Sequence, residues 1–390
     1  MKPMEALVCQ LCNGTLRAEG SYYVCEYCGT KYLGEKTPIT PPLAAASRPT
    51  QYIPSATLPP KPGCKQFAVD LGTASTTIYA KDVGIVLREP SVIAVDRQPD
   101  PQRVIAVGRQ TNPAHGSAVL VHPLQRGAIS DFNLAADMLK FFLQQAGMRS
   151  SMVTRNEIMI GLPKGATEVD RRAVFATAKA TGAKNVLWIE QPMAAAIGAG
   201  LAVAEVTGCM VVDIGAGISE TAVISLGEIV ASRSIFTAGS SFDDAIIAYI
   251  KNRYSLLIDE NAAEGIKINI GSAFPYQGEA AMSIQGRGAM NGLPGSADVT
   301  AAEIRQALAI PLSQILEAVS ATLRETPPEH VASISRDGIA LTGGGALLRG
   351  LDVWLAQELQ MPVRVAKDAP DCVANGAGSA VDNMHLYHSR

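Results

Sequence analysis

The chain carries one pattern twice, and this internal repeat restricts its fold more than any other feature. In residues 67–80 and again in residues 210–224, an apolar strand ends in an aspartate, a glycine turn follows, and a hydroxyl residue leads into a second apolar strand. Each copy predicts a β-hairpin whose turn exposes backbone N–H groups, and glycine lets anionic oxygens approach the backbone closely. Either hairpin alone could be an ordinary tight turn, but the pair predicts two turns that together bind a chain of phosphates.

Asp70 and Asp213 occupy the same place in the two copies, 143 positions apart. Hydrated Mg²⁺ keeps several waters and needs few carboxylates, so one aspartate at each strand end is suited to hold this ion between the hairpins. A third glycine cluster follows the apolar residues 339–341 and is expected to open a helix. Three successive glycines leave no side chain between the backbone and a flat ligand, although such a run could also be a plain loop.

Elsewhere in the body, short apolar runs alternate with helical patterns, which is typical of an α/β fold. The strand-like runs are residues 67–69, 158–160, 186–189, 210–212 and 339–341. Three segments predict helices, at residues 167–180, 241–253 and 301–325. The first of them has a capping-box start, with Thr167 followed three residues later by Asp170, and Gly182 as a stop.

Four of the seven cysteines lie in the first 28 residues, as two Cys-x-x-Cys pairs separated by twelve residues. Each pair lets a tight turn present two thiolates to one ion, and two pairs close a four-sulfur site with no open position for catalysis. The sequence therefore predicts a structural Zn²⁺ in a zinc ribbon over residues 1–36, with short strands at residues 22–24 and 31–33. Its ligands would be Cys9, Cys12, Cys25 and Cys28. Unligated thiols and disulfides are the alternatives, and an unsecreted chain disfavours disulfides.

The segment after the ribbon is a proline-rich linker. Residues 37–64 contain eight of the 23 prolines and have no helical or strand periodicity. The ribbon has no net positive charge and the whole chain carries only -3, so we expect a protein partner for the ribbon and no nucleic acid. Because the sequence has neither a secretion signal nor an apolar run long enough to span a membrane, we expect a cytoplasmic protein.

Six segments of the body resemble the MreB family of bacterial actins, the rod-shape-determining proteins. They are residues 70–76, 84–92, 191–200, 213–217, 326–329 and 341–352. The similarity runs in order through residues 66–383 without large gaps. It implies an α/β fold of the actin-like ATPase type, with two ribonuclease-H-like lobes around a nucleotide cleft. Lobe I would be residues 65–205 completed by residues 368–385, lobe II residues 206–367, and the tail residues 386–390.

The resemblance assigns the repeated turns to phosphate binding. The first phosphate loop would be Gly72, Thr73, Ala74 and Ser75, and the second Gly215, Ala216, Gly217, Ile218 and Ser219. Asp70 and Asp213 would organise Mg²⁺. Thr342, Gly343, Gly344 and Gly345 would border the adenosine of ATP, and Glu264 and Lys267 would reach its ribose and base. Without the resemblance, Glu264 and Lys267 would be a solvated surface pair at helical spacing.

Three positions of this chain depart from the family pattern. Family members commonly have glutamate where this chain has Gln191, a residue that would face the attacking water. Glutamine cannot serve as a base, but it can orient water, as it does in some GTPases. Ala216 and Ile218 stand where the second loop usually has glycine and threonine, so one hydroxyl is lost. We therefore expect a slow ATPase, with Gln191, Asp70 and Asp213 as its catalytic residues.

The resemblance further implies that the protein polymerises with itself into cytoskeletal filaments, helps determine cell shape and organises cell-wall synthesis. Membrane-associated cell-wall elongation proteins would then be partners, which would place the protein peripherally at the inner face of the membrane, and the ribbon would bind a protein not yet identified. The alternative is a nucleotide-binding filament scaffold with little or no hydrolysis. A sugar kinase would need an acceptor pocket with a catalytic aspartate, and a heat-shock chaperone would need a substrate domain after Arg390, so neither is expected.

Overall fold

The structure is a computed structural model that describes residues 16–19, 22–25, 31–33, 37–38, 64–96, 103–111, 118–149 and 155–382. The chain divides into two compact units. The larger unit comprises Tyr52–Phe242, Ser313–Leu347 and Leu359–Arg390, and the smaller one Met1–Gln51, Asp243–Leu312 and Leu348–Glu358. Both repeated hairpins belong to the larger unit. Across the described ranges, every helix is too short or too polar to cross a membrane.

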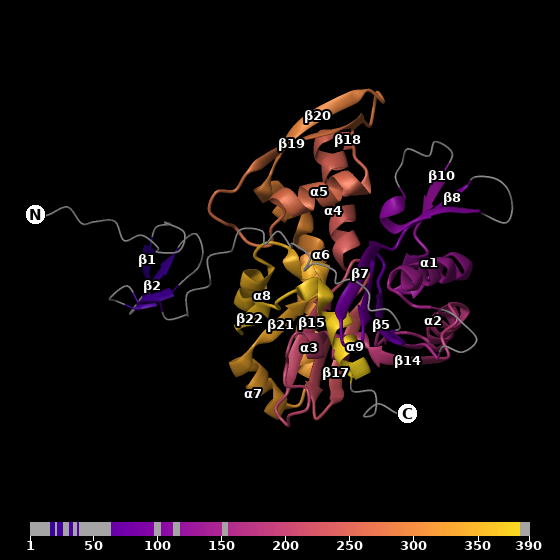
Figure 1. The fold of residues 1–390 in the computed structure, drawn as a ribbon. Helices are drawn as coiled ribbons and strands as arrows, with labels where there is room; N and C mark the ends of the chain where they lie inside the picture. Colours follow the sequence, from indigo (N-terminus) through magenta and orange to yellow (C-terminus); the bar gives the residue numbers. More distant parts are fainter. Residues whose placement is uncertain are drawn as a thin grey trace, which may run out of the picture. The chain divides into compact units, whose positions relative to one another are not determined.

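Two five-stranded sheets with the same topology form the larger unit (Figure 1). The first sheet has the order β14-β13-β5-β6-β7, with β5 (Gln66–Leu71), β6 (Ser75–Ala80), β7 (Gly84–Pro90), β13 (Glu157–Leu162) and β14 (Asn185–Glu190). The second has the order β17-β16-β15-β21-β22, with β15 (Cys209–Ile214), β16 (Ser219–Ser225), β17 (Glu228–Ile235), β21 (Ile339–Thr342) and β22 (Val363–Val365).

In each sheet the three strands that come first in the sequence form an antiparallel meander. The fourth and fifth strands in sequence order lie on the other side of the first strand and run parallel to it. Both predicted hairpins are therefore confirmed, and the structure extends the repeat to the whole sheets. All five predicted strand runs lie within these strands.

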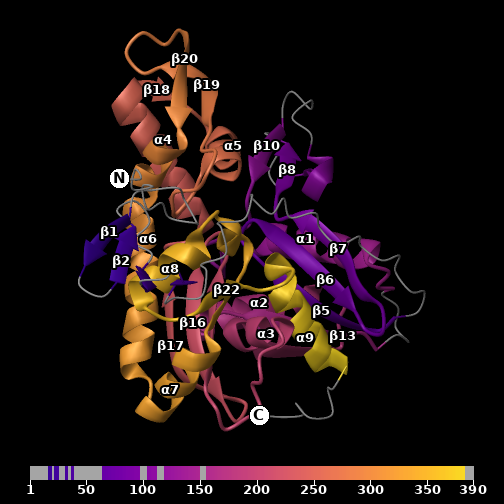
Figure 2. The same ribbon diagram turned by 90° about the vertical axis from the view of Figure 1, so that its left-hand side faces the viewer.

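Helices cover the first sheet on both faces. Alternate residues of β5 point to opposite faces, so Phe67 packs in one cluster with α1 (Phe132–Gln145) and α2 (Glu168–Ala180) while Ala68 packs in the other. That second cluster contains α3 (Gln191–Gly198), α9 (Cys372–Asp382) and residues of the second sheet such as Val211. The helix pair α3 and α9 therefore forms a layer between the two sheets (Figure 2).

Glycine permits the close crossing of α3 and α9. A Cβ atom built on Gly376 would lie 1.8 Å from the carbonyl oxygen of Ala194, and one built on Gly198 would lie 1.9 Å from that of Cys372. Real Cβ atoms do not approach a backbone oxygen so closely, so the two helix backbones touch where the side chains are missing.

The predicted helices are confirmed with small shifts at their ends. Thr167 caps α2, and its hydroxyl accepts a hydrogen bond from the Asp170 backbone N–H at 3.2 Å, completing the capping box. The segments at 241–253 and 301–325 form α4 (Gly239–Tyr254) and α6 (Ala301–Glu325), and each of these helices runs from one unit into the other.

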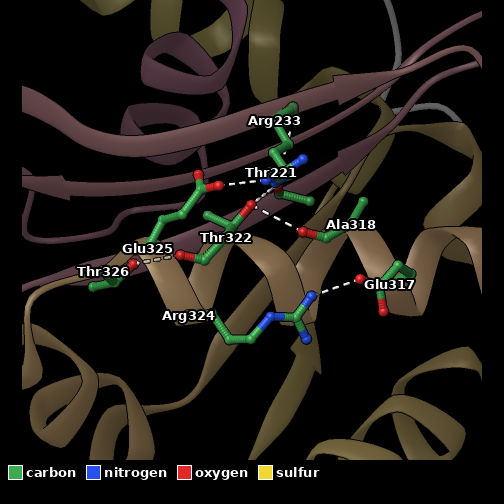
Figure 3. Close-up of polar contacts among 8 residues, drawn as sticks. All are labelled: Thr221, Arg233, Glu317, Ala318, Thr322, Arg324, Glu325 and Thr326. Carbon is green, nitrogen blue, oxygen red and sulfur yellow. Dashed lines mark hydrogen bonds and ion pairs between the residues drawn. The ribbon is translucent and has the colours of Figure 1, made fainter.

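The C-terminal half of α6 contacts the second sheet through buried hydroxyl groups (Figure 3). The hydroxyl oxygens of Thr221 on β16 and Thr322 on α6 are 2.5 Å apart, and Thr322 donates to the Ala318 carbonyl oxygen at 2.9 Å. Arg233 on β17 forms an ion pair with Glu325 at the end of the helix. Thr221 therefore points toward α6, and its neighbour Glu220 points to the opposite face of the sheet.

The remaining elements of the larger unit are short. They are β8 (Ile93–Asp96), β9 (Val104–Val107), β10 (Ala118–Val121), β11 (Leu124–Gln125), β12 (Ala128–Ile129), α7 (Pro328–Asp337) and the 3₁₀ helices η1 (Gly108–Gln110), η2 (Gly344–Leu347) and η3 (Ala369–Asp371). The smaller unit contains β18 (Leu256–Leu257), β19 (Ala281–Gly288), β20 (Pro294–Thr300), α5 (Glu260–Ile270) and most of α8 (Leu351–Leu359).

Near the N-terminus, four short strands form an antiparallel sheet: β1 (Leu16–Glu19), β2 (Tyr22–Cys25), β3 (Lys31–Leu33) and β4 (Thr37–Pro38). The strands predicted at 22–24 and 31–33 are confirmed by β2 and β3. Cys9, Cys12, Cys28 and the side chain of Cys25 lie outside the described part of the chain, as do most of the linker and the tail. The zinc site therefore stays a prediction.

Candidate functional site

The two predicted phosphate loops have the same turn geometry. Gly72 donates its backbone N–H to the Ser75 carbonyl oxygen at 3.1 Å, and Gly215 donates to the Ile218 carbonyl oxygen at 3.0 Å. A Cβ atom on Gly72 would lie 2.8 Å from that same Ser75 oxygen, so the turn needs glycine. The strand registers also correspond, because Asp70 pairs with Thr77 and Asp213 with Glu220.

The structure brings these loops into contact within the larger unit. A Cβ atom on Gly217 would lie 2.5 Å from the hydroxyl oxygen of Thr73, so this glycine allows the second loop to reach the first. The same hydroxyl accepts a hydrogen bond from the Gly127 N–H at 3.0 Å. Ile218 packs on Gly127, where an added Cβ would lie 3.3 Å from its Cγ2 atom. Two turns that are 143 positions apart in the sequence therefore face each other.

The side chains of the loops contribute little that is free to bind. The Ser219 hydroxyl donates to the Thr237 carbonyl oxygen at 2.7 Å, and the side chain of Ser219 is buried. Ala74 has no polar side-chain atom, while Ser75 is exposed. Backbone N–H groups and the hydroxyl groups of Thr73 and Ser75 are therefore the groups with which these loops can bind an anion.

Asp70 and Asp213 form an acidic pair next to the loops. Burial raises the pKa of Asp213 to about 6, although a hydrogen bond from the Thr342 hydroxyl, at 2.7 Å, opposes this effect. Burial and then the charges of Asp213 and Asp371 raise the pKa of Asp70 to about 7. Two carboxylates that repel each other in a buried place are stabilised by a cation between them.

This donor set fits Mg²⁺. Among the described residues, no group of three or more His, Cys, Asp or Glu side chains is arranged to enclose a metal ion. Two carboxylates with waters suit Mg²⁺, which is reluctant to lose its water ligands. Asp371 is not a third free ligand, because it accepts two hydrogen bonds from Arg88, from Nε at 2.7 Å and from an Nη atom at 2.6 Å.

Glu220 is a site residue that the sequence analysis missed. Its side chain is 1% exposed, and its Oε1 atom accepts hydrogen bonds from the Ser234 hydroxyl and the Lys164 backbone N–H, both at 2.7 Å. Its Oε2 atom is buried and has no hydrogen-bond partner within the described part of the protein. Burial, the largest effect, raises the pKa of Glu220 to about 7. The predicted hairpin could have indicated this residue, because Glu220 is the cross-strand partner of Asp213.

Gln191 begins α3 directly after β14 and is 8% exposed. Its side chain packs on β13, where a Cβ atom on Gly161 would lie 3.2 Å from its Cγ atom. Pro192 lies in the first turn of this helix. Proline suits this position because backbone N–H groups of the first turn have no partner within the helix, so none is lost, and because its φ angle is already helical. The neighbouring Glu190 forms an ion pair with Lys164, the residue whose N–H binds Glu220. The role of Gln191 toward a water molecule stays a prediction.

Two of the three consecutive glycines pack on the end of β15. Cβ atoms on Gly343 and Gly345 would lie 2.3 Å from the Ile214 carbonyl oxygen and Cγ2 atom, respectively, while one on Gly344 would meet nothing within 4 Å. Only Gly344 therefore faces open space. The helix expected after this cluster is the short η2, followed by α8. Thr342 is fully buried and positions Asp213, so its hydroxyl is already engaged.

Glu264 and Lys267 lie on α5 in the smaller unit. Lys267 forms an ion pair with Asp243 of α4, with 2.8 Å between Nζ and Oδ2, and both side chains are largely buried. Glu264 is exposed. Their assignment to the ribose and base stays a prediction from the family resemblance.

The raised pKa of Glu220 predicts how stability depends on pH. The folded protein holds this proton more tightly than the unfolded chain, whose glutamate has a pKa of 4.5, so the resulting stability is complete below pH 4.5 and is lost as the pH rises to about 7. We expect Glu220→Gln to match the wild type near pH 4 and to exceed its free energy of unfolding by about 3 kcal/mol at pH 8. Thermal unfolding in EDTA at both pH values measures this, and an equal shift at both would contradict it.

The duplicated sheets, with a glycine hairpin and an aspartate at the end of each first strand, define an actin-like protein. A family model described as MreB/Mbl protein matches residues 64–389. The chain therefore belongs to the MreB/Mbl family, which confirms the resemblance and the fold class expected for the body.

Relatives with assigned roles support this membership. The cell shape-determining protein MreB of Escherichia coli K12 is 44% identical over 327 residues, which are 82% of this chain and 94% of that protein. The cell shape-determining protein Mbl of Bacillus subtilis 168 is 42% identical, over 84% of this chain and 98% of that protein. A solved structure of MreB5 of Spiroplasma citri bound to ADP is 35% identical, covers 83% of this chain and 98% of its own, and has a TM-score of 0.77.

A MamK double helical filament has a similar fold, with a TM-score of 0.69 at 22% identity, over 81% of this chain and 99% of that chain. At this level of identity the likeness concerns the fold alone.

Proposed function

We propose that this protein is an ATP-binding bacterial actin homologue that polymerises into cytoskeletal filaments, helps determine cell shape and organises cell-wall synthesis. The observation that carries the proposal is the contact between two glycine turns, each closed by the same backbone hydrogen bond, beside Asp70 and Asp213. It is supported by relatives named as cell shape-determining proteins and by a solved relative that holds ADP. Self-association is supported by the filament of the fold relative MamK.

Each part of the site has a distinct task in this proposal. The backbone N–H groups of the two loops bind the phosphates, and Thr342 keeps Asp213 oriented. Mg²⁺, when bound through Asp70 and Asp213, neutralises phosphate charge. Gln191 orients water, so ATP hydrolysis is slow. A scaffold that binds nucleotide without hydrolysing it is the second candidate, because Gln191 is not a base and Ile218 carries no hydroxyl.

The full chain is expected to bind ATP and to form filaments only when Mg²⁺ is present, because the acidic pair repels phosphates without a cation between them. Calorimetry with ATP, and electron microscopy with ATP, with ADP and without nucleotide, measure this, and excess EDTA is the control. Phosphate release compared with filament mass separates the slow ATPase from the scaffold. Absence of any heat on adding ATP with Mg²⁺ would contradict the proposal.

The N-terminal segment acts as a zinc ribbon that docks on a protein partner and, through membrane-associated cell-wall elongation proteins, holds the filaments at the inner face of the membrane. Support comes from the spacing of Cys9, Cys12, Cys25 and Cys28 in the sequence and from the antiparallel sheet that β1 to β4 form. We expect one bound zinc ion per chain by elemental analysis and none in a Cys9→Ser, Cys12→Ser variant. A zinc-free wild-type protein purified without chelators would contradict this assignment.

A further inference from the structure

A third hairpin touches both phosphate loops. It is formed by β11 and β12, and its two-residue turn consists of Arg126 and Gly127. The Gly127 N–H donates to the Thr73 hydroxyl of the first loop at 3.0 Å. A Cβ atom on Gly217 of the second loop would lie 2.9 Å from the Cα atom of Arg126 and 3.0 Å from its backbone nitrogen. The tip of the β11–β12 hairpin therefore lies where the two loops meet.

Arg126 has a backbone conformation that its side chain does not favour. The φ angles of Arg126 and Gly127 are 49° and 74°, and two-residue hairpin turns with positive φ at both positions are of type I′. Asparagine followed by glycine is the preferred pair in this turn, because both residues adopt positive φ at little cost. A longer side chain is strained there, and residues strained in this way cluster at binding and catalytic sites. The turn itself therefore does not explain the arginine.

The guanidinium of Arg126 is free to bind a ligand. Its side chain is exposed, and within the described ranges it forms no ion pair and no side-chain hydrogen bond. Two other basic residues beside the site already have carboxylate partners, since Arg88 pairs with Asp371 and Lys164 with Glu190. The phosphate loops themselves contain no basic residue.

The charges at the loops indicate what this cation binds. A nucleotide phosphate tail carries several negative charges, whereas the loops offer only neutral N–H and hydroxyl groups next to the carboxylates of Asp70 and Asp213. A protein cation at the loops offsets part of the phosphate charge. The guanidinium of arginine suits this task because its planar fork of donors matches two phosphate oxygens and it stays charged at every physiological pH.

We propose that the guanidinium of Arg126 binds the phosphate tail of the nucleotide, which makes Arg126 a ligand-binding residue of the site. This inference rests on the proposed function. Because the Arg126 backbone touches the second loop, its long side chain reaches phosphates bound where the two loops meet. An asparagine at this position would give a less strained turn but no cation.

Arg126→Asn separates this role from a structural one. Asparagine is the preferred residue at this position of a type I′ turn, so the variant should fold at least as well as the wild type. It removes the guanidinium and leaves the hydrogen bond from Gly127 to Thr73 in place. A residue with only a structural task would therefore lose nothing by this change. Arg126→Lys is the conservative variant, because it keeps the charge without the planar fork.

The second sheet provides a matched control. Leu226 and Gly227 form the two-residue turn between β16 and β17, and their φ angles of 52° and 76° are close to those of Arg126 and Gly127. Leu226 is exposed, and it follows the end of β16 that is opposite to the second phosphate loop. Leu226→Asn therefore relieves the same kind of strain at a turn that does not touch the phosphate loops.

ATP affinity is measured by calorimetry with Mg²⁺, and thermal unfolding in EDTA without nucleotide, for the full-length wild type and the three variants. We expect Arg126→Asn to raise the ATP dissociation constant about 10- to 100-fold, the range for losing a hydrogen-bonded charge contact. Arg126→Lys should lie between Arg126→Asn and the wild type, and Leu226→Asn should bind ATP like the wild type. Both asparagine variants should unfold about 1 to 3 °C above the wild type.

Adenosine is the second probe, because it lacks the phosphates. The wild type and Arg126→Asn should bind adenosine alike. Equal ATP affinity of Arg126→Asn and the wild type would overturn the role of Arg126, as would equal losses for adenosine and ATP or an equal loss in Leu226→Asn. Weaker ATP binding by an Arg126→Asn variant that also unfolds at a lower temperature would show a structural role instead.

The proposed function fails by a different result. A wild type that binds no ATP in the presence of Mg²⁺ would remove the nucleotide site itself. If the wild type binds ATP and only the Arg126 variants behave unlike the expectation, the nucleotide site stands and the role of Arg126 is wrong.

Discussion

Gly376→Ala is expected to lower the free energy of unfolding by about 3 kcal/mol or more, the upper end for added volume in a packed core. The new methyl group would lie 1.8 Å from the Ala194 carbonyl oxygen, which is a backbone atom inside α3 and cannot rotate away. Relief requires α3 and α9 to separate, and these helices form the layer between the two sheets. Urea unfolding followed by circular dichroism measures the loss.

Gly265→Ala is the matched control for this substitution. Gly265 lies within α5, and a Cβ atom there would meet no atom within 4 Å. Alanine at such a position favours the helix by about 0.5 to 1 kcal/mol, so this variant should unfold at a slightly higher urea concentration than the wild type. If Gly376→Ala unfolds at the wild-type midpoint, the close helix crossing is wrong.

The sequence predicted the parts of the fold that depend on local patterns. Each hairpin is encoded within about fifteen residues, because the alternation of apolar residues, the glycine and the aspartate all act on near neighbours. The capping box of α2 is similarly local. The repeated sheet was implied by the family resemblance and not by the hairpins themselves, and the two sheets do share one strand order.

Contacts between segments far apart in the sequence could not be predicted from local patterns. Arg88 and Asp371 form a buried ion pair although 283 positions separate them, and neither residue stands in a pattern that marks it. The Ser219 hydroxyl was expected to serve the phosphate loop, but its bond to Thr237 depends on how β17 ends. Glu220 could have been predicted, because Asp213 and the register of the hairpin were both predictable and this register pairs Glu220 with Asp213.

Asp213→Asn is expected to weaken the binding of ATP with Mg²⁺ and to stabilise the protein without them. Loss of one partner of a buried charge contact costs about 2 to 5 kcal/mol, which is at least about a 30-fold rise in the dissociation constant. Asparagine keeps an oxygen for the Thr342 hydroxyl, at 2.7 Å in the wild type, so the local packing is retained. Calorimetry with ATP and Mg²⁺, and thermal unfolding in EDTA, measure the two effects.

Asp213→Asn should weaken ATP binding but raise stability, because the Asp213 carboxylate has a cation beside it only when Mg²⁺ is bound. Asp213 is 7% exposed and lies near Asp70, whose pKa its charge helps to raise, so without a metal ion its negative charge destabilises the fold. Asp371 is buried more deeply but has Arg88 as its own cation, and their side chains are 1% and 9% exposed, respectively. Asp371→Asn should therefore destabilise the metal-free protein by about 3 kcal/mol or more, because it leaves Arg88 buried without its charge partner. If Asp213→Asn instead lowers stability in EDTA and leaves ATP binding unchanged, Asp213 is a structural residue like Asp371 and not a cation ligand.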